Sequence, residues 1–219
     1  MGAIFMVQPT SNKIILCGTA KEEPIFSHEV FGESFFTFKL EIKRLSGQTD
    51  ILPVMISDRL VSGKEIKIGS RYLIEGQLRS YNIIVDNKSR LQLQTFAREI
   101  SNDETGEDVN QIALDGFICK NPVYRVTPFS REIADVLIAV NRAYGKSDYI
   151  PSICWGRNAR YCQQLNVGDG IHVEGRLQSR EYQKKLEDET VINKIAYEVS
   201  VSKLSVSKEA TDEFNENKG

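Results

Sequence analysis

The chain has 219 residues, of which 41% are hydrophobic and 26% charged, and its formal net charge at pH 7 is −2. This is the composition of a globular protein with one large or two small domains, and no apolar run approaches the ~20 residues that a membrane helix needs. The four cysteines form no C-x-x-C pair, which argues against a zinc site and a disulfide framework and favours a reducing, cytoplasmic setting.

The first half of the chain opens with a short N-terminal extension, residues 1–11, and continues with strand-like patterns. Phe36, Phe38 and Leu40 alternate with polar residues, and this period of two predicts a half-buried strand. Residues 102–109 read N-D-E-T-G-E-D-V, with four acids and no base. Such a run cannot pack a core, so we expect an acidic linker here.

The second half gives a clearer order of elements. Residues 136–140 read V-L-I-A-V, which predicts a strand that is buried on both faces. A second strand is expected over residues 149–155, and residues 159–165 are the only helix-like stretch.

Strands and loops complete this half. We expect a strand over residues 171–177, where Gly175 indicates a bend in a barrel. A polar hairpin loop over 180–190 should lead to a last strand over 194–203. Residues 207–219 form a polar tail that we expect to be disordered.

The two halves are related by an internal repeat. Residues 173–179 read V-E-G-R-L-Q-S where residues 74–80 read I-E-G-Q-L-R-S. A shift of 98 residues, rising to 99 after one insertion, keeps this register along most of each half. Further pairs in register include Gly18 and Gly116, Arg44 and Arg142, and Asp50 and Asp148. We therefore expect two homologous domains, residues 12–101 and 110–206.

The order β-β-β-α-β-β in about 95 residues is the order of a small Greek-key barrel of the OB type. Closure of such a barrel removes exposed strand edges. The predicted fold is therefore all-β, with two tandem OB folds that are each a five-stranded barrel with one short helix. Another small barrel or a sandwich is the alternative.

Residues 110–204 resemble a bacterial single-stranded DNA-binding protein (SSB). The motifs that carry the resemblance are G-F-I-C-K-N-P (116–122), L-I-A-V-N-R-A-Y-G-K (137–146), D-Y-I-P (148–151), C-W-G-R-N-A (154–159) and G-D-G-I-H-V-E-G-R-L-Q-S-R-E-Y (168–182). The first half resembles the family more weakly, through residues 18–24 and 74–80. The resemblance implies a homodimer that supplies four OB folds.

The family stacks DNA bases on aromatic side chains, and four of its stacking positions match aromatic residues here: Tyr144, Tyr149, Trp155 and Tyr182. An aromatic platform suits any sequence, because every base has a flat π-face. By strand parity, Tyr149 and Trp155 share one face of their strand. The alternative is that these rings, Trp155 above all, are part of the core.

Basic residues near the aromatic positions are candidates for phosphate contacts. They are Arg125, Arg131, Arg142, Lys146, Arg157, Arg176, Arg180 and Lys184. Arg142, Arg180 and Lys184 adjoin aromatic positions most closely. The alternative is that these are solvated surface charges.

The first half departs from the family pattern. Its residues at the four stacking positions are Ser46, Ile51, Ser57 and Ile83. Its phenylalanines Phe35, Phe36 and Phe38 are expected in the core, while Tyr81 lies one or two positions from an expected site. We expect the first barrel to bind DNA weakly, or to serve dimerisation or a partner.

The excess of acidic over basic residues lies in the linker and in the tail. The linker has four acids, whereas residues 12–101 and residues 110–206 each have 13 bases and 11 acids. The net charge therefore does not exclude a DNA partner. The C-terminal residues 211–219 lack the acidic run with a hydrophobic tip through which the family recruits repair and replication enzymes, so recruitment through this tail is not expected.

Nothing in the sequence has the pattern of a catalytic, metal or cofactor site. The predicted function is sequence-independent, non-enzymatic binding of single-stranded DNA in replication, recombination and repair, at the nucleoid in the cytoplasm, with replication or repair proteins as further partners. The alternative is an OB-fold interaction module of a replication-restart or mobile-element complex that acts mainly through protein partners.

Overall fold

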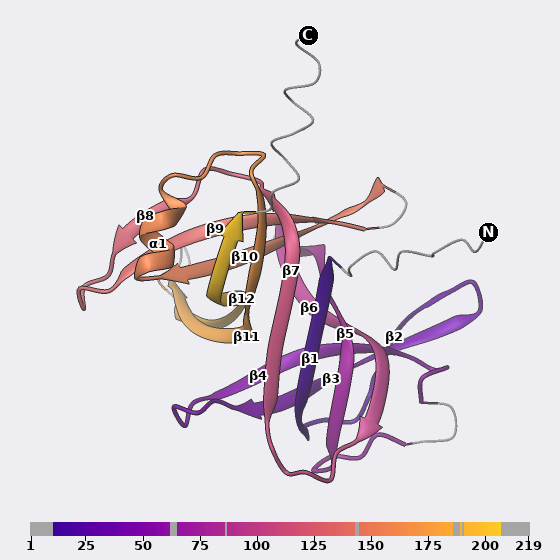
Figure 1. The fold of residues 1–219 in the computed structure, drawn as a ribbon. Helices are drawn as coiled ribbons and strands as arrows, with labels where there is room; N and C mark the ends of the chain where they lie inside the picture. The colour runs from indigo at the N-terminus through magenta and orange to yellow at the C-terminus, as the bar shows by residue number, and fades with distance from the viewer. Residues whose placement is uncertain are drawn as a thin grey trace, which may run out of the picture.

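The computed structural model describes residues 11–61, 65–85, 87–142, 145–185, 189 and 191–206, and Figure 1 shows their fold. The strands of the first repeat are β1 (Asn12–Ala20), β2 (Ile25–Val30), β3 (Glu33–Lys43), β4 (Thr49–Ser57), β5 (Arg71–Val85) and β6 (Lys88–Asn102). The elements of the second repeat are β7 (Val109–Ile118), β8 (Val123–Val126), β9 (Glu132–Asn141), β10 (Ser147–Trp155), α1 (Arg157–Cys162), β11 (Gly170–Lys185) and β12 (Val191–Val206).

Each repeat closes into a five-stranded barrel. In the first, β1 pairs with β5 and with β3, and the parallel pair β4–β6 completes the ring. The second barrel closes in the same way through β7–β11, β7–β9 and the parallel pair β10–β12. The strands β2 and β8 extend each barrel as short additional hairpin strands. These pairings confirm two tandem OB folds.

The two barrels share one continuous sheet. β1 and β7 pair antiparallel from Asn12 opposite Leu114 to Cys17 opposite Val109, and Figure 1 shows these strands side by side between the barrels. At the same junction the side chain of Asn12 accepts from and donates to the backbone of Leu78, and Asn110 does the same at Leu177. The junction therefore has approximate twofold symmetry, which follows from the repeat.

Alternation of side chains builds the core of each barrel. Phe38, Leu40 and Ile42 on β3 are buried and their neighbours on the other face are not, which confirms the predicted strand. Gly175 lies at a register shift between β11 and β12, where a Cβ would stand 2.2 Å from the carbonyl oxygen of Ser200. Only glycine fits so close an approach, so the predicted bend at Gly175 is confirmed.

Several predicted elements differ in extent. β9 is not buried on both faces, because Leu137 and Ala139 alternate with buried neighbours and are half-buried. Residues 180–185, predicted as loop, continue β11 because they pair with residues 191–196 of β12. In the first repeat, the described residues that correspond to the start of α1, 59–61, form turns rather than a helix.

The acidic linker is held against the first barrel. The non-strand segment is 103–108, and Arg71 forms ion pairs with Asp103 (2.8 Å) and Asp108 (2.6 Å). The Asp108 carboxylate also accepts a hydrogen bond from the backbone N–H of Lys43 at 2.6 Å. The predicted tail and residues 1–10 of the N-terminal extension lie outside the described residues. Within the described part, no helix is long and apolar enough to cross a membrane.

Candidate nucleic-acid interface

Trp155 ends β10 on the outer face of the second barrel. Ile150, Ser152 and Cys154 point into the core, so strand alternation turns Tyr149 and Trp155 outward, where they are 44% and 37% exposed. The indole Nε1–H donates to Ser200 Oγ on β12 at 3.1 Å. This bond fixes one edge of the ring and leaves a third of the side chain open to a partner.

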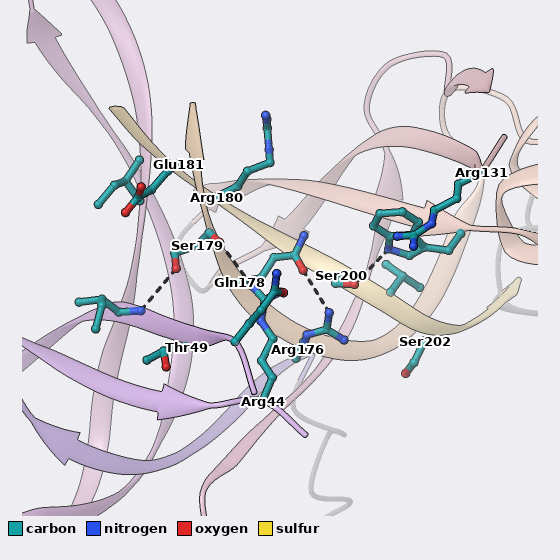
Figure 2. A pocket seen from close by; sticks show the side chains of 15 residues that line it. Arg44, Thr49, Arg131, Arg176, Gln178, Ser179, Arg180, Glu181, Ser200 and Ser202 are labelled. Carbon is teal, nitrogen blue, oxygen red and sulfur yellow. Dashed lines mark hydrogen bonds between the residues drawn. The ribbon is translucent and has the colours of Figure 1, made fainter. Parts of the chain in front are cut away.

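A groove of about 770 Å³ runs along the outer face of β11 and β12 beside Trp155. Its lining residues come from both repeats: Arg44, Gln48, Thr49, Ile51, Arg131, Trp155, Arg176, Gln178, Ser179, Arg180, Glu181, Ile195, Ser200, Val201 and Ser202. In Figure 2, Arg131 lies at the Ser200 end of the groove, and Arg180 and Glu181 lie toward the Ser179 end. The groove therefore combines an indole ring with arginines distributed along its length.

Arg176 and Arg180, which both line this groove, differ in the contacts of their guanidinium groups. Arg176 donates to Gln178 Oε1 at 3.3 Å, but its Nε is buried and has no hydrogen-bond partner among the described residues. Burial, reinforced by the nearby Arg44 guanidinium, lowers the pKa of Arg176. Arg180 lies over the ring of Tyr182, 5.8 Å from its centroid, with Glu198 3.7 Å away. An anion in the groove would compensate both guanidinium groups.

The guanidinium of Arg142 has a different partner from the one that the sequence suggests. It forms a bidentate ion pair with the fully buried Asp148 and donates to the carbonyl of Ser80 in the other repeat at 3.0 Å. Asp148 also accepts from the backbone N–H of Ser80, and the N–H of Tyr149 donates to Ser80 Oγ. Arg142 therefore joins the two barrels, and a phosphate would have to displace Asp148.

The same arrangement occurs once more at the junction, with the repeats exchanged. Arg44 forms a bidentate pair with the buried Asp50, at 2.7 and 2.6 Å, and donates to the carbonyl of Ser179. Asp50 accepts from the N–H of Ser179 at 2.8 Å. We call these two sets of contacts the inter-repeat clasps. The clasps are not among the contacts that the sequence predicts, although each clasp pair appears in register in the repeat.

The remaining predicted residues are scattered around this groove. Arg125 pairs with Asp135 on the exposed β8–β9 hairpin, and Lys146 is exposed in the turn before β10. Arg157 lines a second, smaller depression, which Trp155 also lines. Tyr144 and the side chain of Lys184 lie outside the described residues. The structure thus gathers Trp155, Arg131, Arg176 and Arg180 in one groove, with Tyr182 directly beyond Arg180 on the same face of β11.

Among the described residues, no group of three His, Cys, Asp or Glu side chains is placed to hold a metal ion. The four cysteines are free, and Cys154 and Cys162 are fully buried in the core of the second barrel.

Comparison with known proteins gives matches for both halves. The model of the single-strand binding protein family matches residues 109–206. Single-stranded DNA-binding protein 1 of Staphylococcus aureus (strain COL) is 33% identical over 84 residues, which are 35% of this chain and 50% of that protein. Single-stranded DNA-binding protein B of Bacillus subtilis (strain 168) is 33% identical over 86 residues, 35% of this chain and 74% of that protein. The chain therefore spans about half the length of the S. aureus relatives that it matches.

A solved structure matches across both barrels. The wild-type single-stranded DNA binding protein from Thermus aquaticus superposes with a TM-score of 0.71 at 22% identity, and the match covers 90% of this chain and 92% of that one. At this identity the likeness demonstrates the shared fold, which includes the tandem arrangement of the two barrels.

Proposed function

Because the chain belongs to the single-strand binding protein family, we propose that it binds single-stranded DNA without sequence specificity, through the groove beside Trp155. The observation that carries this proposal is an exposed indole in a groove whose cations include Arg131, Arg176 and Arg180. Stacking on an aromatic face and contacts with phosphates read no base edges, so binding is independent of sequence.

In this mechanism each type of side chain has one role. Bases stack on Trp155 and on Tyr182, whose ring already packs against the Arg180 guanidinium. Phosphates pass Arg131, Arg176 and Arg180 and compensate the buried, partly unpartnered guanidinium of Arg176. Tyr149, which is 44% exposed at the start of β10, extends the stacking surface, and Tyr144, Lys146, Arg157 and Lys184 are proposed contacts beyond the groove.

The biological role follows from family membership. We propose that the protein is a non-enzymatic component that covers single strands during replication, recombination and repair at the nucleoid. We also propose a homodimer, since two chains supply four OB folds. A native mass of twice the 24.8 kDa of one chain, measured in solution, tests the dimer, and a monomer contradicts it.

Fluorescence of Trp155 tests the DNA site directly, because it is the only tryptophan of the chain. Titration with oligo(dT) should quench the emission, with weaker binding at high salt and weaker binding of duplex DNA. Unchanged emission without binding in a filter assay would refute the proposal and favour a module that acts through protein partners.

A matched pair of variants separates stacking from general loss of surface. Trp155→Ala should weaken binding by about 1–3 kcal/mol, which is about five- to 150-fold. Tyr161→Ala removes a ring of similar exposure, 41%, from α1, outside the groove, and should bind like the wild type. Both variants should retain the circular dichroism of the wild type. Equal affinities for the two variants would contradict stacking on Trp155.

A further inference from the structure

The first barrel carries two aromatic rings at the place where Trp155 lies in the second. A Cβ added at Gly76 would lie 2.2 Å from the carbonyl oxygen of Phe96, and one added at Gly175 would lie 2.2 Å from that of Ser200. Phe96 is therefore the counterpart of Ser200. The counterpart of Trp155 is Ser57, which pairs across β3–β4 with Phe35. The ring that is absent at position 57 is thus replaced from both neighbouring strands, and the two ring centroids are 5.9 Å apart.

These rings lie on the outside of the barrel and do not belong to the core. Phe36 and Phe38 alternate with Phe35 on β3; Phe38 is buried and Phe36 packs against the core. Phe35 points the other way, is half-buried and stacks on His28 with centroids 5.1 Å apart. Phe35 therefore differs from the core position that the sequence suggests.

Two arginines lie over the same ring. The guanidinium carbons of Arg79 and Arg98 are each 5.4 Å from the centroid of Phe96, and both groups donate to Oε1 of Gln77. Among the described residues, no carboxylate lies within ion-pair distance of either arginine. The Nε of Arg79 is buried and has no acceptor in the part of the chain that the structure describes. Burial, reinforced by the nearby Arg142 and partly opposed by Asp148, lowers the pKa of Arg79.

Arg79 on this face corresponds to Arg176 in the groove beside Trp155, but the order of arginine and glutamine along the strand is reversed. In the second repeat Arg176 donates to Gln178, and in the first Arg79 donates to Gln77, so arginine and glutamine have exchanged positions in the repeat. In both cases the Nε is buried without a partner. Each barrel thus places an arginine with an unpartnered, buried Nε on the face that carries its aromatic side chains.

We propose that Phe35, Arg79, Phe96 and Arg98, which we call the first-barrel platform, form a second base-stacking site for single-stranded DNA. This inference rests on the proposed function of the Trp155 groove and extends it to the other repeat. A base stacks on the exposed part of the Phe96–Phe35 pair, and its phosphates contact Arg79 and Arg98. Tyr81, which is 43% exposed, adds a further ring on β5. Its neighbour Ser80 accepts a hydrogen bond at Oγ from the backbone N–H of Tyr149 in the second barrel.

A tryptophan moved to the platform tests this site separately. In the double variant Phe96→Trp and Trp155→Phe, the only indole lies on the first barrel. Oligo(dT) should quench it in a salt-dependent manner. Quenching of Trp155 in the wild type together with unchanged emission of the double variant would overturn the inference and leave the proposed function intact. Absence of binding by the wild type would overturn both.

Substitution at the platform should shorten the DNA that one chain covers. Phe96→Leu keeps the apolar contact with Phe35 and removes the π-face, and should weaken binding of a long oligo(dT) by about five- to tenfold. Phe26→Leu is the matched control, since Phe26 is 57% exposed on β2 and packs on Phe36, on the opposite face from Phe35. Arg98→Gln, an exposed change with little risk to folding, should reduce the salt dependence. Unchanged occluded length and affinity in both platform variants would contradict the inference.

Discussion

The inter-repeat clasps make a strong prediction about Asp148. This carboxylate is fully buried and accepts hydrogen bonds from Arg142 Nε and from the backbone N–H of Ser80, both at 2.5 Å. Asp148→Ala leaves the Arg142 guanidinium without its counter-charge, and breaking a fully buried pair in this way costs about 3–5 kcal/mol. Since a quarter of the Arg142 side chain is exposed, water offsets part of this cost, and we expect a loss of about 2–4 kcal/mol in the free energy of unfolding.

Urea unfolding followed by the emission of Trp155 measures this loss, because the single tryptophan lies in the same barrel as Asp148. Asp135→Ala is the matched control: it also removes a carboxylate from a bidentate arginine pair, but the Arg125 and Asp135 side chains are 52% and 45% exposed. Such a surface pair contributes about 0–1 kcal/mol. Similar losses in the two variants would refute the structural role of the clasp.

The same variant also distinguishes the two roles of Arg142. If Arg142 were a phosphate contact, removal of Asp148 would release its charge and tighten the binding of oligo(dT). A structural clasp predicts no gain in affinity, because the released side chain loses the partner that orients the turn before β10. Tighter binding by Asp148→Ala, measured under conditions where the variant is folded, would therefore contradict our assignment.

Two further predictions concern titratable groups. Burial, reinforced by Asp103, raises the pKa of the Cys17 thiol to about 11. At pH 8, Cys17 should therefore not react with a disulfide reagent in the native protein, whereas the half-exposed Cys119 should react. Fast labelling of Cys17 would contradict this. Hydrogen bonds from Thr105 and Arg71 hold the pKa of Asp103 well below its usual range, so its contribution to stability is present above the unfolded pKa of about 3.9 and is lost as the pH falls through the folded value. The difference in unfolding free energy between the wild type and Asp103→Asn should thus be equal at pH 7 and pH 5 and shrink below about pH 4, and a difference that grows on acidification would contradict it.

Patterns with a local cause were predictable from the sequence. Alternation placed Phe38 and Leu40 inside β3, and a glycine within a strand located the bulge at Gly175, because both follow from the geometry of a single strand and its neighbour. The hairpin extension to residue 185 was missed, since polar composition does not exclude a solvated two-stranded ribbon. The core role assigned to Phe35 failed because adjacent phenylalanines on one strand face opposite sides.

The clasps were harder to predict because they depend on a long-range partner. Arg142 lies two residues before an aromatic position, which in sequence suggests a DNA contact, and its partner Asp148 follows six residues later across a turn. The repeat did contain a signal: both the arginine and the aspartate recur at a shift of 98 residues, as Arg44 and Asp50. An arginine and an aspartate that recur together in both copies indicate an ion pair, whereas a contact with phosphate would require only the arginine.

The first-barrel platform explains why a comparison of the four stacking positions alone understated the aromatic character of the first repeat. The chemistry of a sheet face is set by cross-strand neighbours. Phe35 on β3 pairs with Ser57 on β4, Phe96 on β6 pairs with Met55 two residues earlier on β4, and the two phenylalanine rings contact each other. A face that has no ring at one position can therefore carry one from an adjacent strand. Since β6 lies where the two repeats no longer align at a constant shift, only the spatial equivalence of the two glycine bulges relates Phe96 to the Trp155 region.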